Sequence, residues 1–112
     1  MNKQTVNESS SVETELYEVN VPGKFIGKAV IDSNARMIGI ARSLRIRIPG
    51  GIPEIMVKGL DVEFPIKVES IIAVGGIIQM DTPLKNVEEV DINDILQLRE
   101  EIREEIEAIF ST

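Results

Sequence analysis

The stretch from Phe25 to Ile48, FIGKAVIDSNARMIGIARSLRIRI, decides the fold class. Its last residues, Leu44–Ile48, alternate an aliphatic side chain with an arginine, which is the period of a strand with one buried face. Near its middle, Ser33-Asn34 suits a turn, because Asn tolerates positive φ and Ser bonds to the local backbone. The stretch therefore predicts a β-hairpin whose longer arm runs over residues 37–48.

Short apolar runs separated by Gly and Pro continue on both sides of this hairpin. Strand-like runs occupy residues 17–21, 54–58, 60–67 and 77–80, and the Pro49-Gly50-Gly51 step interrupts them. Ile and Val dominate the hydrophobic 43% of the chain while aromatic residues make up only 4%, which favours sheet. About six short strands at regular spacing predict a small barrel or sandwich.

After Pro83 the hydrophobic period changes from two to about 3.6, which predicts one amphipathic helix. Asp91 or Asn93 can cap its first turn. The expected apolar stripe comprises Ile95, Leu98, Ile102, Ile106, Ile109 and Phe110. The sequence thus predicts a mainly β fold in three parts: a disordered polar tail over 1–14, a small barrel or sandwich over 15–82, and an acidic amphipathic helical segment over 83–112.

Composition narrows the function classes. The chain has no Cys and no His, which removes disulfides, thiolate nucleophiles and imidazole chemistry. Asp32, Asp61 and Asp81 fall at expected strand ends or turns, where Asp is common for backbone reasons. We therefore expect no catalytic residues, no metal ligands and no cofactor. No apolar run reaches the roughly 20 residues of a membrane span, and the N-terminus lacks a signal-peptide core, so we expect a cytoplasmic protein without membrane insertion.

Charge is unevenly distributed along the chain. Residues 87–112 hold nine acids and two bases, which accounts for the whole net charge of −7, while residues 24–80 are mildly basic. The candidate basic binding face comprises Arg42, Arg45, Arg47 and Lys58. Such a stripe can contact phosphates, it can simply solubilise a strand, or it can receive the acidic helix as an electrostatic complement. The acidic ends and the scarcity of aromatic residues disfavour nucleic acid.

Two segments resemble the PRC-barrel family. Residues 27–34 (GKAVIDSN) followed by 38–41 (IGIA) are similar to the opening hairpin of that family, and 64–66 (FPI) leading to 71–78 (IIAVGGII) is similar to its closing segment. The likeness spans about residues 24–81. It departs from the family at two turn positions, where Ala35 replaces a common Gly and Gly76 a common acid.

Three glycines of these segments, Gly27, Gly39 and Gly75, are expected to permit the bends that a small barrel needs. The resemblance implies a six-stranded barrel that acts as a docking surface. A lone barrel with a C-terminal helix is most similar to the stand-alone PRC-barrel proteins of archaea, some of which take part in cell division and bind the SepF-type membrane anchor of FtsZ.

The resemblance thus implies a non-enzymatic protein–protein adaptor, recruited to the division site and paired with a SepF-like protein, a paralogue or a second copy of itself. The alternative is an RNA- or ribosome-associated factor of the RimM type that uses the basic strand face. Two surfaces are candidates for the adaptor: an edge strand of the barrel that offers its backbone to another chain, and the helix stripe. Because an isolated helix is marginal in water, the stripe packs either on the barrel itself or on a partner.

Overall fold

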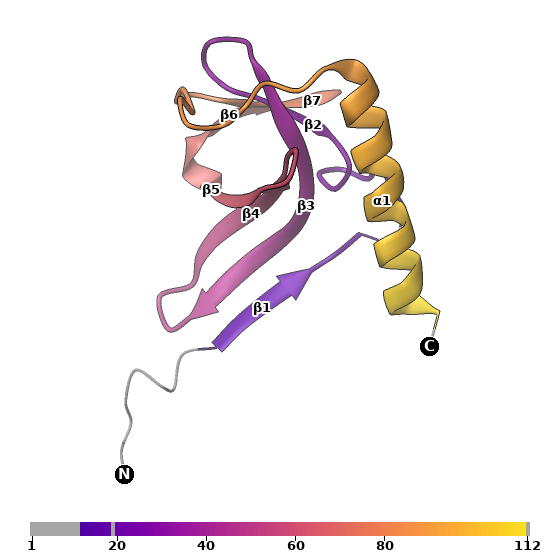
Figure 1. Ribbon diagram of the computed structural model, residues 1–112. Coiled ribbons are helices and arrows are strands. Elements are labelled where there is room, and N and C mark those ends of the chain that lie inside the picture. The colour runs from indigo at the N-terminus through magenta and orange to yellow at the C-terminus, as the bar shows by residue number, and fades with distance from the viewer. Residues whose placement is uncertain (1–11, 19, 112) are drawn as a thin grey trace.

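The computed structural model describes residues 12–18 and 20–111 of the 112-residue chain (Figure 1). The strands are β1 (Val12–Leu16), β2 (Ala29–Ile31), β3 (Met37–Ile48), β4 (Ile52–Lys58), β5 (Glu63–Lys67), β6 (Ile71–Val74) and β7 (Ile77–Met80). A 3-10 turn, η2 (Val68–Ser70), joins β5 to β6, and one α-helix, α1 (Ile92–Phe110), follows β7 in the described part of the chain. The prediction of a mainly β fold with a C-terminal helix is confirmed.

The strands form one mixed sheet in the order β5-β4-β3-β2-β7-β6, with β1 added to the second half of β3. Neighbours are antiparallel except β2 and β7, which are parallel. Figure 1 shows the sheet strongly curled, yet none of the described strand pairs joins β5 to β6. The hydrogen-bonded sheet is therefore open and seven-stranded, which differs from the six-stranded barrel expected. One physical reason is η2, which interrupts the extended backbone between its two outermost strands.

The first strand begins earlier than the sequence predicts. Residues 12–14, which the sequence assigns to the polar tail, pair with the end of β3. The strand β1 stops at Leu16, so the strand predicted at 17–21 is not found at its described residues 17, 18, 20 and 21. Neighbouring polar residues obscure the alternation of Val12, Thr14 and Leu16 in the sequence. The backbone pairing with β3 stabilises this segment as a strand. The other residues assigned to the tail, 1–11, lie outside the described part of the chain.

Asp32 holds the turn between β2 and β3. Its fully buried carboxylate accepts hydrogen bonds from the backbone N–H groups of Asn34 at 2.9 Å, Arg36 at 3.1 Å and Leu84 at 3.2 Å. The guanidinium of Arg36 lies 3.7 Å from the same carboxylate. Asp32 therefore forms the turn, as the sequence predicts, and it also anchors the segment that leads to α1 through Leu84.

Of the three expected bend glycines, two occupy backbone that requires glycine. Gly39 has φ 150°, and an added Cβ would lie 2.4 Å from the carbonyl oxygen of Lys58 on the neighbouring strand. Gly27 has φ 90°, and its Cβ would lie 2.6 Å from Val21 Cγ1. Gly75 differs from this expectation: a Cβ there meets open space, because that glycine sits at the tip of the β6–β7 hairpin.

Replacing Gly39 by Ala should therefore lower the free energy of unfolding by about 2 kcal/mol, since the new methyl group meets a backbone atom that cannot move independently. Urea denaturation followed by circular dichroism measures this change. Gly75→Ala is the matched control and should change stability by less than about 0.5 kcal/mol. Equal stabilities of the two variants would show that β3 and β4 do not approach as closely as described.

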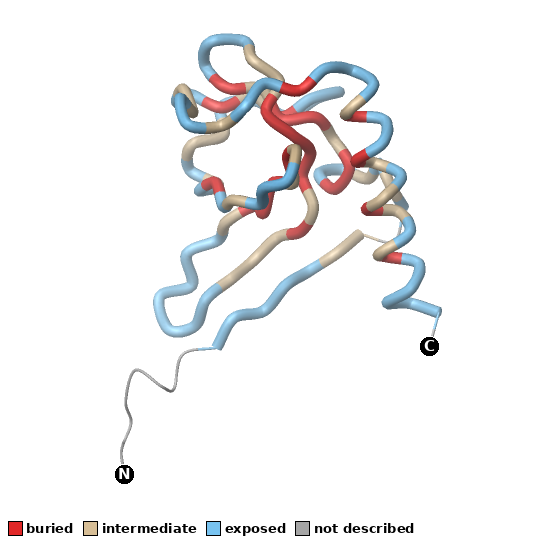
Figure 2. The backbone as a smooth tube through the Cα atoms, viewed as in Figure 1, coloured by how far each residue is buried: buried red, intermediate tan, exposed pale blue. Residues whose placement is uncertain are grey.

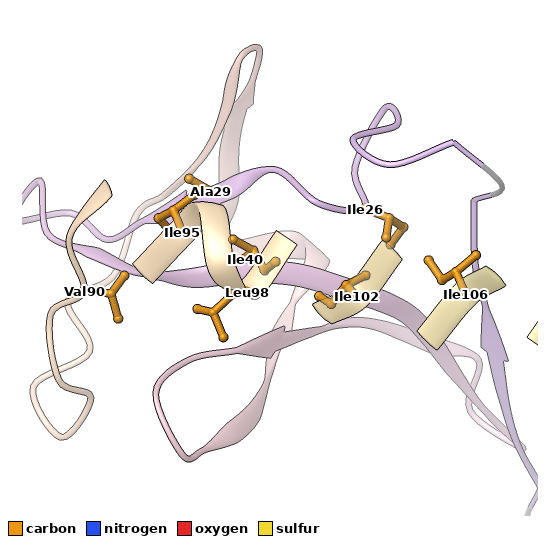
Figure 3. Close-up of a cluster of buried hydrophobic side chains, with 8 residues drawn as sticks. All are labelled: Ile26, Ala29, Ile40, Val90, Ile95, Leu98, Ile102 and Ile106. Atoms are coloured by element: carbon orange, nitrogen blue, oxygen red, sulfur yellow. The ribbon is translucent and has the colours of Figure 1, made fainter. Parts of the chain in front are cut away.

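The helix begins at a capping box and packs on the sheet. Asp91 accepts a hydrogen bond from the backbone N–H of Asp94 at 2.9 Å, and the Asp94 carboxylate accepts one from the N–H of Asp91 at 2.9 Å. One face of α1 joins the sheet in a hydrophobic cluster (Figure 3), formed by Ile26, Ala29, Ile40, Val90, Ile95, Leu98, Ile102 and Ile106. A second cluster, on Val30, Ile38 and Ile55 among others, fills the curled sheet.

This packing corrects the interface expected on the helix. Ile95, Leu98, Ile102 and Ile106 are each 5% exposed or less, so these four residues contribute to the core of their own chain (Figure 2). Of the six stripe residues, only Ile109 and Phe110, at its end, are exposed. Of the two alternatives left open by the sequence, the structure places the stripe on its own sheet.

Candidate protein-binding site

Each residue of the predicted basic face has a carboxylate within 4 Å. Arg42 lies 3.4 Å from Glu15, 3.4 Å from Glu63 and 3.2 Å from Glu105. Arg45 contacts Glu54 at 2.9 Å, Arg47 Nε lies 3.0 Å from Glu13 Oε2, and Lys58 lies 3.0 Å from Glu105 and 3.2 Å from Glu101. The strands thus bring the four cations near one another but pair each of them internally. A face whose cations are already compensated has little charge left for phosphates.

Glu105 links the acidic helix to the sheet, which is one of the sequence alternatives for the basic face. Its two carboxylate oxygens accept hydrogen bonds from Arg42 Nε at 3.2 Å and Lys58 Nζ at 3.0 Å. Partial burial alone would raise the pKa of Glu105, but the hydrogen bond and charge of Lys58 and the charge of Arg42 outweigh it and hold the pKa below its ordinary value. Arg45 and Arg47 instead pair with acids of adjacent strands.

A depressed carboxylate pKa contributes stability that is present above the unfolded-state pKa and lost as pH falls through the folded-state pKa. Glu105→Gln should therefore cost about 0.5–1 kcal/mol at pH 7, a discounted value because the Glu105 side chain is 40% exposed. The difference from the wild type should shrink below about pH 4 and in 1 M salt. Urea titrations at pH 7 and pH 3 test this, and a pH-independent difference would contradict it. Glu107→Gln, on the exposed face of α1, is the control.

An apolar groove opens beside β1, with a cavity volume of about 270 Å³. It is lined by Leu16, Tyr17, Glu18, Phe25, Ile26, Leu44, Pro53, Ile55 and Val68. These residues come from the end of β1, the loop that follows it, the β3–β4 hairpin and η2, so only the tertiary structure assembles them. Leu16 and Phe25 are 46% and 43% exposed at its rim. The sequence does not predict this site, because its only local signal is the aliphatic side of the Leu44–Ile48 alternation.

The single carboxylate of the groove is occupied by the loop that forms one wall. Glu18 accepts hydrogen bonds from the backbone N–H groups of Lys24, Phe25 and Ile26, each at 2.7 Å. Burial raises the pKa of Glu18, but these three donors and the nearby charge of Lys28 outweigh burial and lower it. The carboxylate holds Phe25 and Ile26 in place, which leaves a preformed apolar wall.

A second cavity, of about 360 Å³, lies between the first turns of α1 and the β4–β5 connection. Asp61, Glu63, Asp94 and Glu101 line it together with Lys58. Within the described residues, no group of three or more acidic side chains is placed to hold a metal ion. The apolar groove is therefore the better candidate for binding.

In the described part of the chain, no helix is long and apolar enough to span a membrane. No protein-family model matches the chain, and no curated protein matches it. The class of the protein therefore rests on its own fold and site: a small, mainly β domain with a C-terminal helix, a basic strand face paired with internal carboxylates, and an apolar groove beside an edge strand.

Proposed function

We propose that this chain is a non-enzymatic adaptor that binds another protein through the apolar groove. The groove is the observation that carries the proposal, because preformed apolar concavities bordered by exposed aliphatic or aromatic side chains are typical of binding surfaces. Its rim residues Leu16 and Phe25 are large, apolar and exposed. The internal pairing of the basic side chains favours a protein partner over RNA.

In more detail, we propose a cytoplasmic adaptor of the PRC-barrel type that acts at the division site. Its partner would be a SepF-like protein, a paralogue or a second copy of this chain. Its support is the resemblance itself, together with the place of the two segments that carry it. Residues 27–41 form the β2–β3 hairpin, and residues 64–78 run from β5 to β7, so both belong to one curled sheet. A SepF-like protein is accordingly the first partner to test.

The experiment is affinity capture of the tagged wild type and of two groove variants, Leu16→Asp and Phe25→Asp, with nuclease added and a purified SepF-like protein tested in parallel. Both replaced side chains are partly exposed, so the variants should fold. Ile72→Asp, on β6 and 63% exposed, is the matched control outside the groove. We expect a nuclease-resistant protein partner that both groove variants lose, by at least about tenfold in affinity, and the control retains.

Two results would contradict the adaptor. One is capture of the same proteins by the wild type and both groove variants, which would leave the groove without a role. The other is capture of ribosomal proteins that disappears with nuclease and with Arg45→Glu/Arg47→Glu, which would replace the adaptor by the RNA-associated alternative. Circular dichroism of every variant checks that a loss of binding is not a loss of fold.

A further inference from the structure

Opposite charges alternate across four neighbouring strands on one face of the sheet. In register, Lys67 of β5 lies opposite Glu54 of β4, Glu54 opposite Arg45 of β3, and Arg45 opposite Glu15 of β1. One row further along, Arg47 of β3 lies opposite Glu13 of β1. Opposite charges on facing residues stabilise a sheet, and like charges destabilise it. Each row therefore favours a residue of opposite charge on a strand added at its end. Both rows end at β1 on an acid.

The other face of the same strands is aliphatic. Ile66 of β5, Ile55 of β4, Leu44 of β3 and Leu16 of β1 form one continuous row in register. Val12 lies opposite Ile48 at the far end of β1. Leu16 lines the groove, and Val12 is 54% exposed. A strand added beside β1 would continue this face with aliphatic side chains, which would cover Val12 and Leu16.

The outer edge of β1 is available for such a strand. Among the described strands, β1 pairs with β3 alone, and all five of its residues are exposed. An edge strand presents unpaired N–H and C=O groups, which are a template for another extended chain. Backbone pairing, aliphatic packing and charge therefore converge on one short edge.

We propose that β1 accepts an extended segment of a partner protein in which aliphatic and basic residues alternate. The proposal rests on the adaptor function and names the chemistry of its partner. The basic residues of that segment would share Glu13 with Arg47 and Glu15 with Arg42, since both acidic side chains remain 45% and 37% exposed despite these ion pairs. The aliphatic residues would lie on the face of Leu16 and extend the groove wall.

A second copy of this chain is not the occupant. Antiparallel pairing of two β1 strands about Thr14 would place Glu13 of one copy opposite Glu15 of the other, and like charges directly opposite are destabilising. The segment of this chain that has the required alternation, Leu44–Ile48, already pairs with β1 on one edge and β4 on the other. The pattern therefore points to a different protein.

The test uses the full chain and a synthetic peptide, fluorescein-KIRIRIK-amide, whose binding is followed by fluorescence anisotropy at 150 mM salt and by the backbone amide shifts of β1. We expect saturable binding with the largest shifts in residues 12–16. Methylating alternate peptide amides should abolish binding for one set and spare the other, because only one set of N–H groups faces β1. Glu13→Gln/Glu15→Gln should weaken binding about fivefold, and the peptide EIEIEIE should not bind.

Equal binding of both N-methylated sets, or no binding by about 1 mM peptide, would overturn the strand-addition proposal. The charge-reversed peptide keeps the test decisive if the double glutamine variant loses its fold. The adaptor function is tested separately, by the capture experiment with the groove variants. If Leu16→Asp loses a captured protein while the peptide does not bind, the adaptor function is supported and the alternating aliphatic and basic segment is rejected.

Discussion

Ile102→Ala is expected to lower the free energy of unfolding by about 4 kcal/mol. Ile102 is 0% exposed and packs between α1 and the sheet, in the cluster with Ile26 and Ile40. Removing three carbons there forfeits their burial and leaves a cavity. The helix cannot close this cavity easily, because Leu98 and Ile106 hold it against the sheet on both sides. Urea denaturation measures the loss.

Leu96→Ala is the matched control on the same helix, because Leu96 is 53% exposed and should cost less than about 0.5 kcal/mol. Ile102→Glu should unfold the whole chain, since it would bury an uncompensated charge. A folded Ile102→Glu variant that has lost only self-association or partner binding would contradict the core position and return the helix stripe to the role of an interface.

Asp32→Ala is expected to cost about 3 kcal/mol, because it leaves the backbone N–H groups of Asn34, Arg36 and Leu84 without their buried acceptor. Burial raises the pKa of Asp32, but these three donors and the charge of Arg36 outweigh it and hold the pKa below its ordinary value. The carboxylate therefore contributes stability above about pH 4, the unfolded-state value, and loses it as pH falls through the lower folded-state pKa.

The measurement is the unfolding free energy of the wild type and Asp32→Ala between pH 7 and pH 2. The difference should be largest near neutrality and should narrow in acid. Asp81→Asn is the control, since the Asp81 side chain is exposed and accepts a hydrogen bond from the adjacent Thr82 hydroxyl. A difference that stays constant with pH would show that Asp32 acts through its shape rather than its charge.

Local patterns predicted the local structure well. The alternation in Leu44–Ile48 and the turn at Ser33-Asn34 predicted the β2–β3 hairpin, and β3 occupies the expected residues 37–48. The change of period after Pro83 predicted α1, and Asp91 is one of its two expected caps. Such features depend on residues a few positions apart, so the sequence contains the information directly.

The same patterns failed where contacts are distant in sequence. An alternation of Arg and Ile indicates that the arginines share a face, but not what lies opposite that face. Lys58 and Glu105 are 47 positions apart, and Arg99 donates to the carbonyl of Gly27 across 72. The predicted basic face is therefore a set of internal ion pairs, and most of the interface expected on the helix is core.

What the sequence by itself determined is the β2–β3 hairpin, the approximate places of β4, β5 and β7, and the helix with its apolar face. Tertiary structure alone decided that Val12–Leu16 is a strand, that the sheet stays open between β5 and β6, and that Leu16, Phe25 and Val68 line one groove. The physical reason is that periodicity specifies which side of an element is buried, whereas register and sheet order specify which residues that side packs against. Those depend on the sum of many weak contacts between distant parts of the chain.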